Sequence, residues 1–284
     1  MSQAAAARSI VSEANPNFRR WLRLAESARA VRETRATLAE GIHLAQAAMQ
    51  SGVPIEAILV RRGTDSADAA RLLMLLPAQA PRYELAPILY DRIAPVEHGA
   101  GLMLVLPVPD DALPERMALD MVILDGIQDP GNAGAILRTA AAAGIRHVLA
   151  TTGTAALWSP KVVRAAMGAH FHLCLHERVT PEQAANALDG AWFAAVAHGE
   201  NSLWASELGT GAVGWIFGGE GGGVSDELLA LAREQVHIPM EGAVESLNVA
   251  AAAAICLFER ARRLSPSPPP LSHAEHGRGV ASGY

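Results

Sequence analysis

One carboxylate within a run of glycines is the feature of this sequence that most directly indicates chemistry. The segment W-I-F-G-G-E-G-G-G-V-S starts at Trp215 and places Glu220 among the glycines. Glycine reaches backbone conformations with positive φ and lets a ligand approach main-chain N–H and C=O groups closely. A buried strand is predicted at 213–217, so Glu220 follows a strand end, where it can meet a cation or a hydroxyl group. A flexible turn without a function stays open as the alternative.

The glycine run matches neither of two common nucleotide-binding motifs. It is not a P-loop, because no Gly-Lys-Ser/Thr follows, and it is not the dinucleotide fingerprint, because it comes after a late strand. A second strand is predicted at 236–240, and another loop follows it. Ligands of open α/β sheets bind at the carboxyl ends of strands, so we expect these two loops to line one pocket.

A second segment, D-P-G-N-A-G-A-I-L-R, combines a turn-rich loop with the start of a helix. Asn132 is predicted to cap this helix, and Arg138 lies further along it. Backbone N–H groups at a helix start and a guanidinium group together suit a phosphate or the edge of a ribose. A simple cap followed by an exposed arginine is the alternative.

Three apolar side chains, two at the end of the second predicted strand and one after it, are predicted to form a slot for a flat heterocycle. They are Ile238, Met240 and Leu247, and backbone groups around them can read the edge of such a ligand. Asn248 adds an amide that both donates and accepts hydrogen bonds. A final helix is predicted over 246–264. A strand edge and a capped helix without a ligand form the alternative.

The rest of the composition argues against several classes of site. None of the 10 histidines has metal-ligand spacing, so no metal is expected, and no serine lies in a G-x-S-x-G motif. Cys174 and Cys256 lie in apolar runs and are interpreted as core residues of a protein in a reducing compartment. Because no signal peptide and no membrane-spanning run is found, we expect a cytoplasmic protein without membrane contact.

Two α/β units are expected to position these residues. Strand and helix patterns alternate from residue 120 onward, which indicates a mostly parallel sheet. The predicted organisation is an N-terminal unit at 1–107, a linker at 108–117, a second unit at 118–264 and a disordered, proline-rich tail at 265–284.

Charge is distributed unevenly along the chain, and the basic residues gather near the N-terminus. The net charge is −6, yet residues 8–35 hold seven arginines against three acids. A helix is predicted over 17–38 with the arginines on one side, and a second, short helix is predicted over 225–234.

Taken together, three motifs resemble those of the SpoU/TrmH family of RNA ribose 2′-O-methyltransferases, within the SPOUT class. They are N-x-G-x-x-x-R at 132–138, F-G-x-E-x-x-G at 217–223 and I-P-M…S-L-N-V-x-x-A at 238–251, in the order and spacing of the family. The segment K-V-V-R-A-A-M-G-A at 161–169 also resembles a family segment. The N-terminal unit, with E-G-I-H-L-A beginning at Glu40, resembles the RNA-binding domain that many members carry.

The resemblance implies a SPOUT-type parallel sheet with a C-terminal trefoil knot, preceded by a small N-terminal α/β RNA-binding domain. It also implies a homodimer whose active site is built across the interface. S-adenosylmethionine would bind in the knot, and the residues that the resemblance assigns to it are Gly218, Gly219, Ile238, Met240, Leu247 and Asn248.

The same resemblance implies methyl transfer to a ribose 2′-hydroxyl without a metal, with Arg138, Asn132, Glu220 and Asn248 as catalytic residues. A guanidinium titrates above roughly 12, whereas a general base works best near the operating pH. We therefore expect Arg138 to stabilise the developing alkoxide or to hold the adjacent phosphate. The residues expected to contact RNA are Arg19, Arg20, Arg23 and Arg138.

Other functions remain open from the sequence alone. Ribosomal RNA is the favoured substrate because of the extra N-terminal unit, and transfer RNA is the alternative. A catalytically inactive RNA-binding protein of the same fold is a further alternative, although the four catalytic candidates together disfavour it. A nucleotide-dependent oxidoreductase is disfavoured because its fingerprint is missing.

Overall fold

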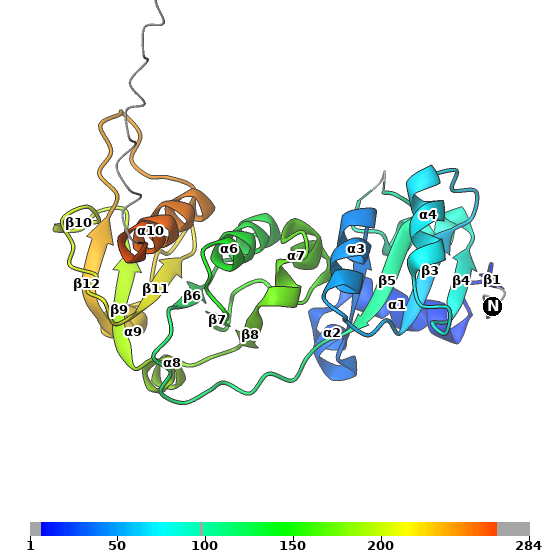
Figure 1. Ribbon diagram of the computed structural model, residues 1–284, viewed down its shortest axis with the longest axis horizontal. Helices are drawn as coiled ribbons and strands as arrows, with labels where there is room; N and C mark the ends of the chain where they lie inside the picture. Colours follow the sequence, from blue (N-terminus) through cyan, green and yellow to red (C-terminus); the bar gives the residue numbers. More distant parts are fainter. Residues whose placement is uncertain (1–6, 97–98, 266–284) are drawn as a thin grey trace, which may run out of the picture.

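Two β-sheets, each with its own helices, follow one another along the elongated molecule (Figure 1). The computed structural model describes residues 7–96 and 99–265. Residues 108–116 connect the two sheets without forming a helix or a strand. The disordered tail predicted for 265–284 lies outside the described residues from position 266 onward. Within the described residues, no helix is both long and apolar enough to cross a membrane.

The first unit is built on a mixed five-stranded sheet in the order β1-β4-β3-β5-β2. Strand β5 pairs antiparallel with both β2 and β3, whereas β4 pairs parallel with β1 and β3. Its elements are β1 (Arg8–Ile10), α1 (Pro16–Glu26), α2 (Ala28–Thr34), β2 (Ala36–Glu40), α3 (Ile42–Gln50), β3 (Ala57–Arg61), α4 (Ala67–Leu75), β4 (Arg82–Leu85), α5 (Pro87–Ile93) and β5 (Leu102–Pro107).

The prediction of one helix over 17–38 is wrong in two places. Ser27 adopts an extended conformation that separates α1 from α2. Helix α2 stops at Arg35, which adopts a left-handed conformation with φ 49°. The next residues, A-T-L-A-E, form the buried strand β2 that pairs with β5. Alanine, leucine and glutamate favour helices, but propensity is a weak preference that tertiary pairing overrides. Here, pairing with β5 decides the outcome.

The second unit is a seven-stranded sheet in the order β10-β12-β9-β11-β6-β7-β8, and every neighbouring pair is parallel. The parallel sheet predicted from residue 120 onward is therefore confirmed. Its elements are β6 (Met121–Asp125), α6 (Pro130–Ala142), β7 (His147–Ala150), α7 (Pro160–Ala165), a 3-10 turn (Ala169–His172), β8 (Cys174–Glu177), α8 (Pro181–Ala187), β9 (Gly190–Ala195), β10 (Asn201–Ser202), β11 (Ala212–Gly218), α9 (Asp226–Leu229), β12 (Ala232–His237) and α10 (Val249–Leu264).

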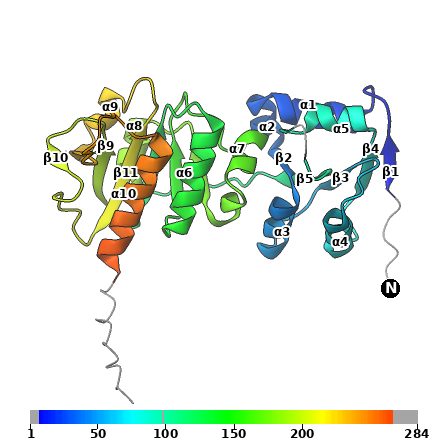
Figure 2. The same cartoon turned by 90° about the horizontal axis from the view of Figure 1, so that it is seen from above.

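Helix predictions near the C-terminus also needed correction. The helix predicted over 225–234 is only the single turn α9, because Ala232 already begins strand β12, which pairs with β9. The helix predicted over 246–264 begins at Val249, because the side chain of Asn248 caps it. Helices α6 and α10 lie side by side against the sheet (Figure 2).

The two units pack directly on each other through β2 and α7. The Thr37 hydroxyl, buried on β2, donates to the carbonyl oxygen of Trp158 at 2.6 Å. One continuous cluster of buried apolar residues extends from the first sheet into the second. The first unit is therefore held against the second by a shared core, in addition to the linker.

A buried ion pair ties the last helix to the entry of strand β6. Arg260, only 3% exposed, donates to Asp120 at 2.9 Å and also to the carbonyl oxygens of Gly209 and Gly211. Asp120 additionally accepts the backbone N–H of Val213 at 2.8 Å.

We expect Asp120→Ala to lower the free energy of unfolding by about 3–5 kcal/mol, because it leaves a buried guanidinium without its carboxylate. Urea denaturation followed by circular dichroism measures this change. The matched control is Arg262→Ala, which removes a largely exposed partner of Glu259 and should cost less than about 1 kcal/mol. Equal losses in the two variants would contradict the special role of the buried pair.

Candidate functional site

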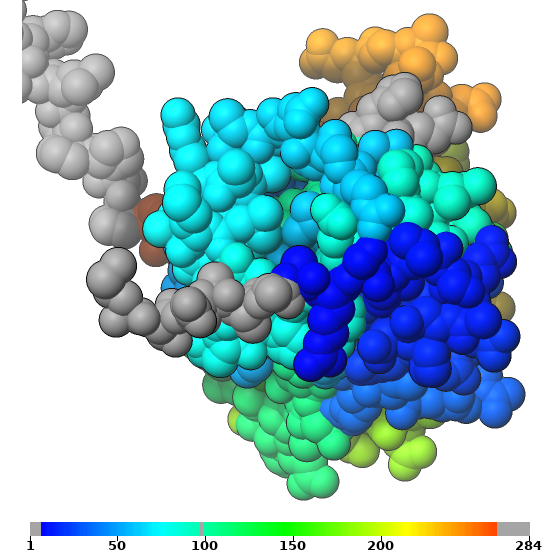
Figure 3. All heavy atoms as spheres, turned by 90° about the vertical axis from the view of Figure 1, so that its right-hand side faces the viewer, coloured from blue at the N-terminus to red at the C-terminus, as the bar shows by residue number. Residues whose placement is uncertain are grey.

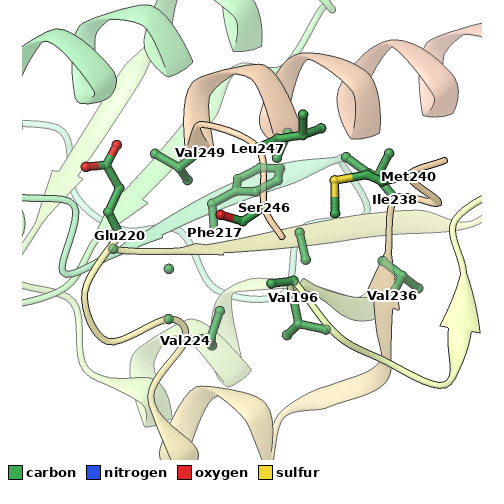
Figure 4. A pocket seen from close by; sticks show the side chains of 16 residues that line it. Val196, Phe217, Glu220, Val224, Val236, Ile238, Met240, Ser246, Leu247 and Val249 are labelled. Atoms are coloured by element: carbon green, nitrogen blue, oxygen red, sulfur yellow. The ribbon is translucent and has the colours of Figure 1, made fainter. Parts of the chain in front are cut away.

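An apolar cavity of about 330 Å³ opens at the carboxyl edge of the second sheet (Figure 4). Strands β9, β11 and β12 end there, and the loop before α10 closes the other side. Figure 4 shows the side chains of Phe217, Ile238, Met240 and Leu247 around this space. The other residues that line it are Ala195, Val196, Ala197, Gly218, Gly219, Glu220, Gly223, Val224, Val236, Ser246, Val249 and Ala252.

Two glycines, one at the end of β11 and one directly after it, are required because other backbone segments approach them closely. A Cβ atom added at Gly218 would lie 2.1 Å from the carbonyl carbon of Gly223, and one at Gly219 would lie 2.4 Å from the carbonyl oxygen of Gly126. Distances this short are steric clashes. By contrast, Gly221 has open space at the same position. The glycine run therefore combines positions fixed by close packing with positions that are free to vary.

Asp125 connects three segments at this edge of the sheet through hydrogen bonds. It was not among the residues predicted from the sequence. Its carboxylate accepts the Thr151 hydroxyl at 2.8 Å and the Ser225 backbone N–H at 2.7 Å. It thereby joins the ends of β6 and β7 to the glycine-rich loop. The signal was present in the sequence, because Asp125 directly follows the apolar run M-V-I-L at 121–124.

A hydrogen-bonded junction brings together the three segments that carry the motifs. The Asn132 amide donates to Glu220 Oε1 at 2.6 Å. The Asn248 amide nitrogen donates to Asn132 Oδ1 at 2.9 Å and to Glu220 Oε1 at 3.2 Å. Because Asn248 Oδ1 also accepts the N–H groups of Ala250 and Ala251, both ends of this amide have fixed partners.

The prediction that Asn132 caps the first helix of this unit is wrong, because the cap lies three residues earlier. Asp129 caps α6, and its carboxylate accepts the backbone N–H of Asn132 at 2.7 Å. Asn132 therefore lies within the first turn of α6, and its side chain is available to contact Glu220.

A second, more polar hollow adjoins the apolar cavity and shares Gly219, Glu220, Gly223 and Val249 with it. Asn132 lines this second hollow. Glu220 thus lies at the boundary between an apolar space and a polar one. Such an arrangement can hold an apolar group of a ligand on one side and orient a hydroxyl group of another on the other side.

Arg138 lies apart from this cavity within its own chain. It is an exposed residue of α6 and is not among the residues that line the two hollows. Glu220, which was expected to hold either Arg138 or the substrate, is hydrogen-bonded to the two asparagines instead.

Of the three arginines predicted to contact RNA on α1, Arg19 and Arg23 are exposed. Arg20 is half-buried and forms an ion pair with Glu56 at 2.7 Å. Only two of the three guanidinium groups therefore face solvent without such a partner among the described residues.

Several residues that line the cavity were missed by the sequence interpretation. They include Val196 and Val224, which Figure 4 shows on the side of the cavity opposite Leu247. Apolar residues in loops give no distinctive pattern, so only the fold could place them here. No cluster of metal-ligating side chains occurs within residues 7–96 and 99–265.

Comparisons with known proteins give consistent results. The model of the SpoU rRNA Methylase family matches residues 120–258. The 23S rRNA (guanosine(2553)-2′-O)-methyltransferase RlmP of Bacillus subtilis (strain 168) is 29% identical over 252 residues, covering 88% of this chain and 98% of that protein.

Solved structures resemble nearly the whole chain. The SpoU methyltransferase AviRb of Streptomyces viridochromogenes, in complex with AdoMet, has a TM-score of 0.77 at 25% identity and covers 88% of this chain and 98% of its own. A TrmH-family protein from Porphyromonas gingivalis has a TM-score of 0.71 at 31% identity, with 89% and 100% covered.

We expect Gly219→Ala to destabilise the protein by about 1–3 kcal/mol, because its Cβ would press on the Gly126 carbonyl in a packed region. Gly221→Ala is the matched control and should be nearly neutral. Thermal unfolding measures both variants. A Gly219→Ala protein as stable as Gly221→Ala would contradict the close approach of the two loops.

Proposed function

This chain belongs to the SpoU family of rRNA methylases, and we propose that it transfers a methyl group from S-adenosylmethionine to a ribose 2′-hydroxyl of ribosomal RNA. The observation that carries the proposal is the junction of Asn132, Glu220 and Asn248 beside an apolar cavity. The names of the relatives support ribosomal RNA as the substrate in preference to transfer RNA.

The cavity fits the cofactor. Ile238, Met240 and Leu247 provide an apolar slot suited to an adenine ring. Gly218 and Gly219 also line the cavity, and they carry no side chain that would keep a ligand from the backbone. S-adenosylmethionine, when bound, supplies an already activated methyl group. The protein's contribution to the rate is then mainly to position the sugar oxygen. An AdoMet complex of a SpoU relative of the same fold supports this assignment.

The proposed roles of the site residues follow from their contacts. Asn132, Glu220 and Asn248 hold one another rigidly and orient the ribose at the mouth of the cavity. Arg138 stabilises the alkoxide that develops on the 2′-oxygen, or holds the neighbouring phosphate, because a guanidinium stays protonated at the working pH.

A homodimer is part of the proposal, because Arg138 lies away from the cavity of its own chain. We infer that a second copy supplies it. Phe258 on α10 is 51% exposed, and the loop between β12 and α10 stands out from the body of the molecule (Figures 1 and 3). Both features are consistent with a surface that a second copy covers. The C-terminal trefoil knot is proposed on the same family membership.

The N-terminal unit is proposed to bind RNA, with boundaries at 1–107 for this unit, 108–117 for the linker and 118–264 for the methyltransferase unit. Exposed Arg19 and Arg23 on α1 support this role, because guanidinium groups without acidic partners can neutralise phosphates. A cytoplasmic location remains a prediction from the sequence.

We expect Arg138→Ala to lower methyl transfer at least about 100-fold, a loss typical of removing a group that stabilises a developing oxyanion, while S-adenosylmethionine still binds. Incorporation of labelled methyl groups into unmodified ribosomal RNA measures transfer, and calorimetric titration measures binding. Normal transfer by Arg138→Ala would remove this residue from the mechanism. Binding of S-adenosylmethionine without any transfer by the wild-type protein would instead favour the inactive RNA-binding alternative.

A mixed-dimer experiment tests whether Arg138 acts on the partner's site. We expect co-expression of Arg138→Ala with Leu247→Asp, which places a charge in the apolar slot, to restore part of the activity. One composite site in the mixed dimer then has both an intact cavity and an intact arginine. No restoration in a purified mixed dimer would show that each chain uses its own Arg138.

We also expect Arg19→Ala/Arg23→Ala to weaken RNA binding and to lower the slope of log Kd against log salt concentration by about 2, one unit for each lost phosphate contact. Arg20→Ala should have a smaller effect, because this guanidinium is already paired with Glu56. Filter binding over a salt series measures all three proteins. If Arg20→Ala weakens RNA binding as much as Arg19→Ala/Arg23→Ala does, the assignment of the exposed arginines to phosphate contacts is wrong.

A further inference from the structure

A cleft of about 810 Å³ lies between the two units, and the proposed chemistry makes no use of it. The turn from β2 into α3 forms one wall, and the starts of α6 and α7 form the other. Figure 1 shows α3 and α7 facing each other at the boundary between the units. Its volume exceeds that of the apolar cavity at the carboxyl edge.

This cleft continues the proposed active site. The apolar cavity and the polar hollow share Gly219 and Glu220. The polar hollow and the interdomain cleft share Asp129, at the start of α6. The three hollows are therefore neighbours, in the order apolar cavity, polar hollow and interdomain cleft. An extended ligand that reaches the cavity from this side passes through the cleft.

Two basic side chains of the second unit line the cleft. Lys161 is the single lysine of the chain and is exposed, with no ion-pair partner within residues 7–96 and 99–265. Arg164 is 38% exposed and lies 3.5 Å from the Glu40 carboxylate of the first unit. Both side chains can therefore contact an anion in the cleft.

The acidic groups of the cleft already have partners within the protein. The Glu40 side chain is fully buried, and burial raises its pKa, an effect that Arg164 and the Tyr90 hydroxyl partly offset. The carboxylate of Asp129 caps α6 and accepts the Asn132 N–H. Lys161, by contrast, is exposed and has no ion-pair partner among the described residues, so it is the charged side chain of the cleft that is most available to a phosphate.

The same cleft offers apolar surface beside these charges. Met167 is 44% exposed and adopts a left-handed backbone conformation with φ 51°. Ile42 and Pro95 line the wall that belongs to the first unit. A groove that pairs basic side chains with flat or apolar surfaces suits single-stranded nucleic acid, whose phosphates and base faces need both.

We propose that this interdomain cleft binds the single-stranded RNA segment that flanks the target nucleotide, with Lys161 and Arg164 contacting its phosphates. The inference rests on the proposed function, since it assigns the path of the RNA beyond the methyl-transfer site. Glu40 is a positioning residue that directs the Arg164 guanidinium toward the cleft. RNA bound there contacts both units at once.

The test compares Lys161→Ala and Lys161→Arg with Arg146→Ala as a control of equal charge loss. Arg146 is exposed and precedes β7, at the opposite edge of the sheet from the site. The probe is unmodified 23S ribosomal RNA transcribed in vitro, bound by the full-length protein over a salt series. We expect Lys161→Ala to weaken binding about 3- to 10-fold and to lower the salt slope by about 1, as one lost phosphate contact does.

Lys161→Arg should keep most of the affinity, and Arg146→Ala should behave like the wild-type protein. If Lys161→Ala binds RNA with unchanged affinity and slope, or if Arg146→Ala loses as much, the assignment of the cleft is wrong. Calorimetric titration with S-adenosylmethionine is run on the same proteins. If the wild-type protein does not bind S-adenosylmethionine, the proposed function is wrong. The RNA-binding measurements test the role of the cleft separately.

Chemical protection provides a second readout that does not depend on a substitution. Because Lys161 is the single lysine, an amine-acylating reagent followed by digestion and mass spectrometry reports on this side chain alone. We expect the 23S RNA to reduce acylation of Lys161 several-fold, and S-adenosylmethionine alone to leave it unchanged. Equal acylation with and without saturating RNA would overturn the proposal.

Discussion

The candidate site of the second unit depends on one carboxylate oxygen, Glu220 Oε1. It accepts hydrogen bonds from the side-chain amides of Asn132 and Asn248. These residues come from helix α6, the loop after β11 and the cap of α10, so a single contact fixes three distant segments. A carboxylate that accepts two amide donors gives a rigid junction. The boundary between the apolar cavity and the polar hollow lies at this point, where a cofactor and a sugar can meet.

The parallel sheet makes that junction possible. Because all its strands point the same way, the loops after β6, β9, β11 and β12 emerge at one edge. Asp125 then fastens the glycine-rich loop to this edge, and Gly218 and Gly219 let it approach the neighbouring backbone. The proposed methyl transfer depends more on how the methyl donor and the ribose are positioned than on reactive side chains. The packing of these loops therefore affects the reaction directly.

The two units are joined by a shared apolar core as well as by the linker, so their surfaces stay next to each other. The contact of Thr37 with Trp158 and the pairing of Arg164 with Glu40 keep the first sheet beside the start of α6. The cleft that we propose for RNA is therefore lined by residues of both units, among them the exposed Lys161. Net charge describes the whole chain, whereas a ligand meets only the charges that line its path.

The sequence by itself determined the parallel sheet, the family and the residues of the junction, because three spaced motifs and a strand–helix alternation are local patterns. It misjudged β2 and β12, whose helix-favouring residues become strands through pairing with β5 and β9. It also missed Asp125 as an anchor, and it could not show that Arg138 lies apart from its own cavity. Those features depend on which distant segments meet, and only the tertiary structure brings such segments together.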